Sequence, residues 1–154
     1  MAKKKELSIF DTLVKKYGDD VVKSGKEVFE EISNRHIIPV SPCLDYALGG
    51  GIQEGSWVQM IGDPKSGKTT TALQIAANAQ REENGSRDIW YINVEGRLNR
   101  KNLEGVEGLD VNSINVFESP METLSAEKYL GAIERIVKEC PKSVIIIDSV
   151  SSMI

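Results

Sequence analysis

Cysteine and histidine are scarce in this sequence, and long apolar runs are missing. The two cysteines, Cys43 and Cys140, lie too far apart for a metal knuckle or a disulfide framework, and indicate reduced thiols in a cytoplasmic protein. The one histidine, His36, excludes a site built from several histidines. Because no apolar stretch approaches the ~18 residues of a membrane span and the lysine-rich start leads into no apolar signal core, we expect no membrane partner.

An excess of positive charge is also missing. The 19 lysines and arginines are outnumbered by 23 aspartates and glutamates, which gives a formal net charge of −4. This balance provides no electrostatic footprint for nucleic acid across the whole chain. If a nucleic acid binds, it must therefore do so at a local patch or at sequence outside these 154 residues.

The pattern of apolar and charged residues changes near residue 36. Residues 1–35 carry apolar positions at helical spacing among charges, which predicts an exposed helical region whose apolar stripe packs on its own core or on a neighbouring subunit. Residues 36–154 alternate apolar runs with helical patterns, which predicts an α/β domain with a parallel sheet flanked by helices. The expected strands are 57–61, 89–94, 113–117 and 144–147, and the expected helices are 68–81 and 126–140, the second capped by Ser119, Thr123 or Ser125.

One motif has a specific chemical meaning. Residues 62–69 match G-x-x-x-x-G-K-S/T in full. The glycines let successive backbone N–H groups point at phosphate oxygens, and the helix that follows directs its positive end at the same anion. The motif lies between an expected apolar strand and an alanine-rich helix, which disfavours a chance match in a glycine-rich turn. The predicted nucleotide-binding residues are Gly62, Asp63, Pro64, Lys65, Ser66, Gly67, Lys68, Thr69 and Thr70.

Four side chains receive individual roles. Lys68 would reach the β- and γ-phosphates of ATP, and the Thr69 hydroxyl would ligate Mg²⁺. Asp148 directly follows the apolar strand 144–147, at the end of the strand where open α/β sheets bind ligands. The position favours a Mg²⁺ ligand over an aspartate that only caps the next segment. Glu95 ends the strand 89–94 in the same way and could polarise the attacking water, although by itself the pattern fits a surface glutamate equally well.

Four segments, in this order, resemble the RecA family of recombinases over residues 41–154. Residues 41–51 resemble the family's segment before the P-loop, and residues 76–82 resemble the end of its P-loop helix. Residues 93–98 resemble the stretch with its catalytic glutamate, and residues 144–150 resemble its Walker B strand. The resemblance implies a P-loop NTPase of RecA type, with Glu95 and Lys68 as catalytic residues and ATP and Mg²⁺ as cofactors.

The resemblance also implies partners. The family consists of DNA-dependent ATPases that form helical homo-oligomeric filaments on single-stranded DNA in homologous recombination and DNA repair. Residues 1–35 resemble, by position and helicity, the family's region that docks on the neighbouring subunit. The related alternatives are a DnaB-type helicase, a RadA- or KaiC-like ATPase, or a non-catalytic module that binds nucleotide or a recombinase.

The sequence departs from the family pattern in two places. No aromatic residue stands at 99–102, where the family stacks one on adenine, so the pattern does not predict base selectivity. The family's DNA-binding loops and its γ-phosphate sensor follow the Walker B strand, and a later strand inserts between that strand and the P-loop strand. We therefore expect a chain truncated after the Walker B strand, with little or no ATPase activity of its own.

Overall fold

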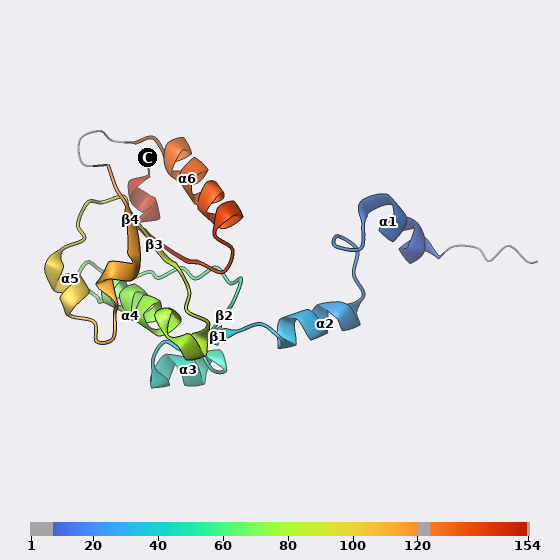
Figure 1. The fold of residues 1–154 in the computed structure, drawn as a ribbon, viewed down its shortest axis with the longest axis horizontal. Coiled ribbons are helices and arrows are strands. Elements are labelled where there is room, and N and C mark those ends of the chain that lie inside the picture. The colour runs from blue at the N-terminus through green and yellow to red at the C-terminus, as the bar shows by residue number, and fades with distance from the viewer. Residues whose placement is uncertain (1–7, 120–123, 154) are drawn as a thin grey trace, which may run out of the picture. The chain divides into compact units, whose positions relative to one another are not determined.

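The computed structural model describes residues 8–119 and 124–153, and the chain divides into two compact units, Met1–Arg35 and His36–Ile154. The first unit contains α1 (Ile9–Tyr17) and α2 (Gly25–Ser33). The second contains every strand of the described residues (Figure 1). Among the described residues, no helix is both long and apolar enough to cross a membrane.

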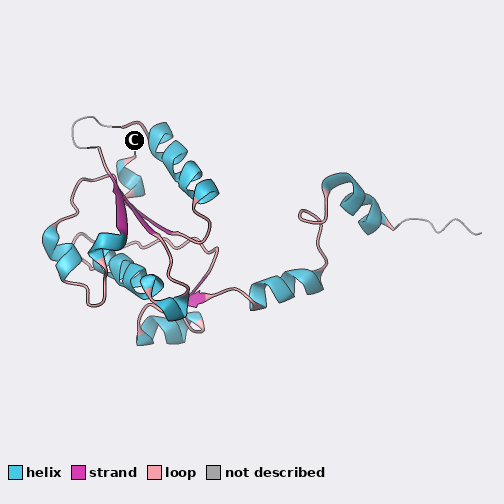
Figure 2. Cartoon of the chain, in the orientation of Figure 1, coloured by secondary structure: helices cyan, strands magenta, loops and turns pink. Residues whose placement is uncertain are grey.

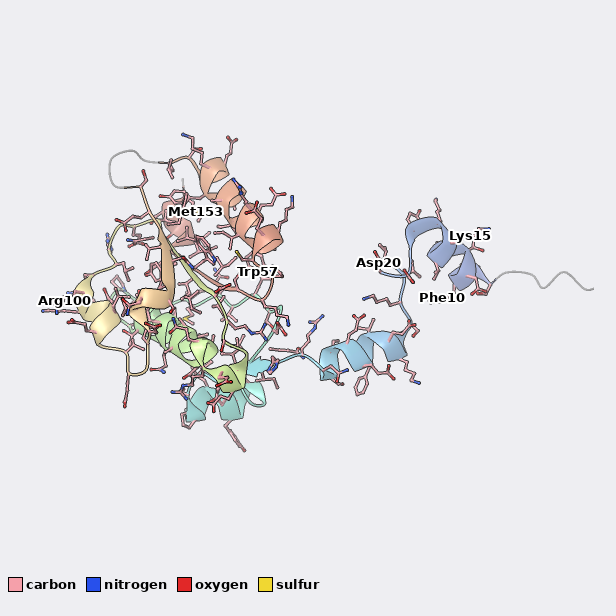
Figure 3. The ribbon with its side chains drawn as sticks, viewed as in Figure 1. Phe10, Lys15, Asp20, Trp57, Arg100 and Met153 are labelled. Atoms are coloured by element: carbon pink, nitrogen blue, oxygen red, sulfur yellow. The ribbon has the colours of Figure 1, made fainter. Side chains whose placement is uncertain are left out.

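The helices of the first unit are stabilised by hydrogen bonds at their N-termini and bury no residue in a core. Ser8 and Asp11 form a capping box at the start of α1, and Ser24 and Glu27 form one at the start of α2. Neither helix buries a residue, and their apolar side chains, Phe10 among them (Figure 3), stay exposed. The predicted helical character of this region is confirmed, and most apolar side chains of α1 and α2 are exposed among the described residues.

The second unit is built on a three-stranded parallel sheet with the order β4-β3-β5. The strands are β3 (Ile89–Asn93), β4 (Ile114–Phe117) and β5 (Val144–Asp148). Figure 2 shows them between α4 (Lys68–Gln80) and α6 (Ala126–Glu139). The expected α/β fold, a parallel sheet flanked by helices, is confirmed.

The central strand β3 contributes to the apolar core on each face of the sheet, because successive side chains of a strand point to opposite faces. On one face Ile89 packs with Ile75 of α4 and Tyr91 packs with Leu73 of α4. On the other face Ile92 packs with Tyr129 and other residues of α6. Ile89, Tyr91 and Ile92 are fully buried. The register aligns Asn93 at the end of β3 with Asp148 at the end of β5, so the carboxyl ends of these strands meet at one edge of the sheet.

Shorter elements complete the second unit. The strands β1 (Ile37–Ile38) and β2 (Ile52–Gln53) pair antiparallel on either side of α3 (Pro42–Leu48), a helix that the periodicity did not predict. Ser125 precedes α6 as its N-cap, and the alternative cap Thr123 lies outside the described residues. The remaining elements are α5 (Arg100–Glu104) and three 3₁₀ turns, η1 (Glu82–Asn84), η2 (Val111–Ser113) and η3 (Val150–Ser152).

The predicted strand at 57–61 is wrong. This apolar segment forms no strand, and Trp57 (Figure 3) and Ile61 are 93% and 86% exposed. An apolar run favours burial, but a strand also needs a neighbour for its N–H and C=O groups. Among the described residues, no strand pairs with this segment. The segment therefore stays outside the sheet even though its composition is that of a buried strand.

Candidate nucleotide-binding site

The predicted phosphate loop leads directly into α4. Gly67 is the N-cap of this helix with φ of 91°, a left-handed conformation that glycine adopts without strain. The first turn, which includes Thr69 and Thr70, contains no acidic residue, so no carboxylate compensates the positive end of the helix dipole. In α1, α2 and α6, by contrast, the first turn carries an acidic residue. The start of α4 is therefore suited to an anion from outside the chain.

The side chain of Lys68 folds back over this loop. Its Nζ donates hydrogen bonds to the carbonyl oxygens of Gly62 at 2.9 Å and Asp63 at 2.8 Å, and a longer one to Ser66 Oγ at 3.4 Å. All of its partners here are uncharged oxygens of the loop. Exchange of a carbonyl for a phosphate oxygen converts a neutral acceptor into a charged one, which strengthens the bond. The ammonium group is thus held beside the place where phosphate would bind.

The two predicted Mg²⁺ ligands lie in contact, although 79 residues separate them in the sequence. Thr69 Oγ1, in the first turn of α4, donates a hydrogen bond of 2.8 Å to Asp148 Oδ2 at the end of β5. The carboxyl ends of parallel strands lie at one edge of the sheet, and the helix after the phosphate loop begins at that same edge. The fold therefore brings a hydroxyl and a carboxylate together beside the proposed phosphate position.

A third side chain reaches the same carboxylate. Tyr91, in the middle of β3, donates a hydrogen bond of 2.6 Å from its hydroxyl to Asp148 Oδ2. Burial raises the pKa of the Tyr91 phenol, and the hydrogen bond to the Asp148 carboxylate raises it further, so the phenol stays protonated. No role for Tyr91 was predicted from the sequence. Its only signal was a tyrosine inside a buried strand, where the hydroxyl needs a polar partner.

Glu95 lies just beyond β3 and is tied to the end of β5. Its backbone N–H donates to the Asp148 carbonyl oxygen at 3.2 Å. Its side-chain Oε1 accepts hydrogen bonds from Ser149 Oγ at 2.7 Å and Ser152 Oγ at 3.2 Å, and Oε2 pairs with Arg97 Nη1 at 3.0 Å. These partners were not predicted. They surround the Glu95 carboxylate with donors, which hold it in one orientation.

The donor set fits Mg²⁺. Hydroxyl and carboxylate oxygens are the hard ligands that this ion prefers, and Mg²⁺ usually adds phosphate oxygens and waters to one or two protein ligands. Thr69 and Asp148 provide such a pair. Within residues 8–119 and 124–153, no cluster of three or more histidines, cysteines and carboxylates could hold a metal without a ligand. The chain thus offers a partial set of Mg²⁺ ligands that a nucleotide would complete.

Residues 99–102 begin α5 instead of forming a flat surface for a base. The side chain and backbone of Asn99 and Asn102 hydrogen-bond to each other as a capping box. Arg100 pairs with Glu104 along the helix at 2.6 Å. The geometry therefore gives this segment a local role in starting a helix, in agreement with the missing aromatic residue.

Comparison with known proteins places these residues in context. The family model of the RecA N-terminal domain matches residues 5–154. A DNA repair and recombination protein RadB of Methanosphaera stadtmanae is 34% identical over 131 residues, which are 82% of this chain and 55% of that protein. A protein RecA of Nitratiruptor sp. is 32% identical over 136 residues, covering 84% of this chain and 37% of that protein. A protein RecA of Chlorobium chlorochromatii is 29% identical over 155 residues, covering 99% and 42%. The chain thus spans about half or less of the length of these relatives.

Proposed function

We propose that this chain, which belongs to the RecA N-terminal domain family, is the ATP-binding part of a RecA-like recombinase. Its four sequence segments predicted the family. The observation that carries the proposal is the contact between Thr69 and Asp148 beside a complete phosphate loop. The names of the relatives, which are recombination proteins, favour a recombinase over a DnaB-type helicase.

In this proposal, residues 62–70 hold the phosphates of ATP. Backbone N–H groups of the loop and of the first turn of α4 donate to phosphate oxygens. Lys68 Nζ turns from the carbonyl oxygens of Gly62 and Asp63 to the β- and γ-phosphates. Thr69 Oγ1 can ligate Mg²⁺ through a lone pair while its O–H group still donates its hydrogen bond to Asp148 Oδ2. The bound Mg²⁺ would neutralise part of the phosphate charge.

Glu95 is the proposed general base. Its carboxylate polarises the water that attacks the γ-phosphate, because a carboxylate accepts the water's proton as the new bond forms. Ser149 and Arg97 fix its orientation through the hydrogen bond and the ion pair described above. The backbone N–H of Glu95 also donates to the Asp148 carbonyl oxygen, so the proposed base and the proposed Mg²⁺ ligand are held next to each other.

The proposed partners are single-stranded DNA and further copies of the chain. Exposed apolar side chains on α1 and α2, such as Phe10 and Phe29, support docking on a neighbouring subunit. The net charge of −4 argues against DNA binding spread over the whole surface. We also propose a cytoplasmic setting, in which Cys43 and Cys140 remain free thiols.

Hydrolysis of ATP with and without single-stranded DNA tests the recombinase proposal. We expect the complete gene product to release phosphate from Mg-ATP several times faster when single-stranded DNA is added. The physical reason is that a DNA-dependent ATPase completes its catalytic geometry only on DNA. A rate that DNA leaves unchanged would contradict a DNA-dependent ATPase, and phosphate release no faster than the background would favour the non-catalytic module. A matched preparation with Asp148→Asn reports any contaminating ATPase.

A further inference from the structure

A buried phenol lies against the carboxylate that we propose to hold Mg²⁺. Tyr91 is fully buried, and its ring packs in the cluster formed by Leu73, Ala77 and Val106. Its hydroxyl donates to Asp148 Oδ2 at 2.6 Å and also interacts with the side chain of Thr69. Because the ring is enclosed by close-packed side chains, the position of the hydroxyl is fixed by the core.

Asp148 needs such a fixed partner. It is the last residue of β5, which is only partly buried and, within the described residues, pairs with β3 alone. The other hydrogen bond to its side chain comes from Thr69 Oγ1, which also goes to Oδ2. Two donors on Oδ2 set the rotation of the carboxylate and leave Oδ1 as the oxygen for a cation or its bound water.

A purely structural interpretation would have the phenol satisfied by whichever acceptor is nearest, since a buried hydroxyl without a partner is costly. Two observations favour a functional role. The acceptor is the carboxyl side chain of Asp148 at the edge of the sheet where β3 and β5 end, not a backbone carbonyl inside the core. The same oxygen also accepts from the Thr69 hydroxyl, the second proposed Mg²⁺ ligand. The phenol therefore acts on the group that would touch the cation.

We propose that Tyr91 is a positioning residue that orients the Asp148 carboxylate and thereby sets the Mg²⁺ affinity of the nucleotide site. This inference rests on the proposed function, because it requires Asp148 to hold Mg²⁺. Partners of metal ligands typically contribute about 10–100-fold to metal affinity. Tyr91 does not touch nucleotide itself. Its effect on the cation is transmitted through the hydrogen bond that it donates to Asp148.

Substitution Tyr91→Phe tests the inference, because it removes the hydroxyl and keeps the ring. The affinity for ADP is measured by calorimetry over a series of Mg²⁺ concentrations. We expect the Mg²⁺ concentration at half-maximal effect to rise about ten-fold or more, while ADP affinity in excess EDTA stays the same. Tyr129→Phe is the matched control. Tyr129 is buried in α6, packs edge-on against Phe117 and belongs to the cluster on the other face of the sheet.

A double-mutant cycle separates positioning from folding. In an Asp148→Asn background the Mg²⁺ midpoint is already raised, and Tyr91→Phe should then change it little, because the two residues act through the same hydrogen bond. Equal effects in both backgrounds would overturn the inference, as would a Tyr91→Phe midpoint equal to that of the unsubstituted chain. If the unsubstituted chain itself binds ADP without regard to Mg²⁺, the proposed function fails instead.

Discussion

Lys68→Ala should abolish measurable binding of Mg-ATP and Mg-ADP. The ammonium group of Lys68 is held against the loop by hydrogen bonds to the Gly62 and Asp63 carbonyl oxygens. A hydrogen bond to a charged group contributes about 1.5–3 kcal/mol, so each lost phosphate contact lowers affinity by about ten-fold or more. Because Lys68 would make several such contacts, calorimetry should detect no binding.

The fold should survive this substitution. The hydrogen bonds of Lys68 are exposed to solvent, so the loop carbonyl oxygens can accept from water when the side chain is removed. We expect a melting temperature close to that of the unsubstituted chain. Lys26→Ala is the matched control, because it removes the same charge from the exposed surface of α2. An affinity for Mg-ADP that Lys68→Ala leaves unchanged would disprove the phosphate assignment.

Glu95→Gln should leave nucleotide binding intact and remove most ATP hydrolysis. Glutamine keeps the shape of the side chain and can still accept from Ser149 Oγ, but it cannot take a proton from water. Loss of a general base typically slows a reaction about 10²–10⁴-fold. Single-turnover phosphate release, measured alongside ATP affinity on the protein as its gene encodes it, separates the two effects.

The control for Glu95→Gln is Glu118→Gln. Glu118 follows β4, and its Oε2 accepts a hydrogen bond of 2.6 Å from Asn93 Nδ2, so the substitution neutralises a second carboxylate at the end of the sheet. We expect this variant to hydrolyse ATP at close to the original rate. Normal hydrolysis by Glu95→Gln would show that the role carried over from the family does not apply to this residue.

Local patterns in the sequence predicted the parts of the fold that local forces determine. The apolar runs of β3 and β5 and the amphipathic pattern of α6 specify buried strands and a one-sided helix. The meeting of Thr69 and Asp148 was expected from a general property of parallel sheets, whose carboxyl ends share an edge. No knowledge of individual contacts was needed for that expectation.

Contacts that depend on register could not be predicted. The alternation of β3 indicates that Tyr91 is buried, but not that its hydroxyl meets Asp148. That contact follows from the pairing of Tyr91 with Ile146 and of Asn93 with Asp148 across two strands far apart in the sequence. The ion pair between Arg97 and Glu95 depends in the same way on the path of the chain after β3.

The segment at 57–61 shows the converse limit. Its apolar residues predicted a strand, because a short apolar run indicates a preference for burial and buried strands have such runs. Strand formation also requires a neighbour, and none of the described residues pairs with this segment. Residue 57 is a tryptophan with 93% of its surface exposed, a value that the pattern alone would not predict. Pattern thus predicts which residues favour a sheet, and the pairing partner decides whether they enter it.

Titration of the unsubstituted chain with ADP and AMP, in Mg²⁺ and after chelation, tests the central claim most directly. The loop and Lys68 are placed to hold the β-phosphate, and Thr69 and Asp148 are placed to hold Mg²⁺. We predict that ADP binds in Mg²⁺, that chelation weakens it by about ten-fold or more, and that AMP, which has no β-phosphate, does not bind measurably. Equal affinities for AMP and ADP, or an ADP affinity indifferent to Mg²⁺, would contradict the account.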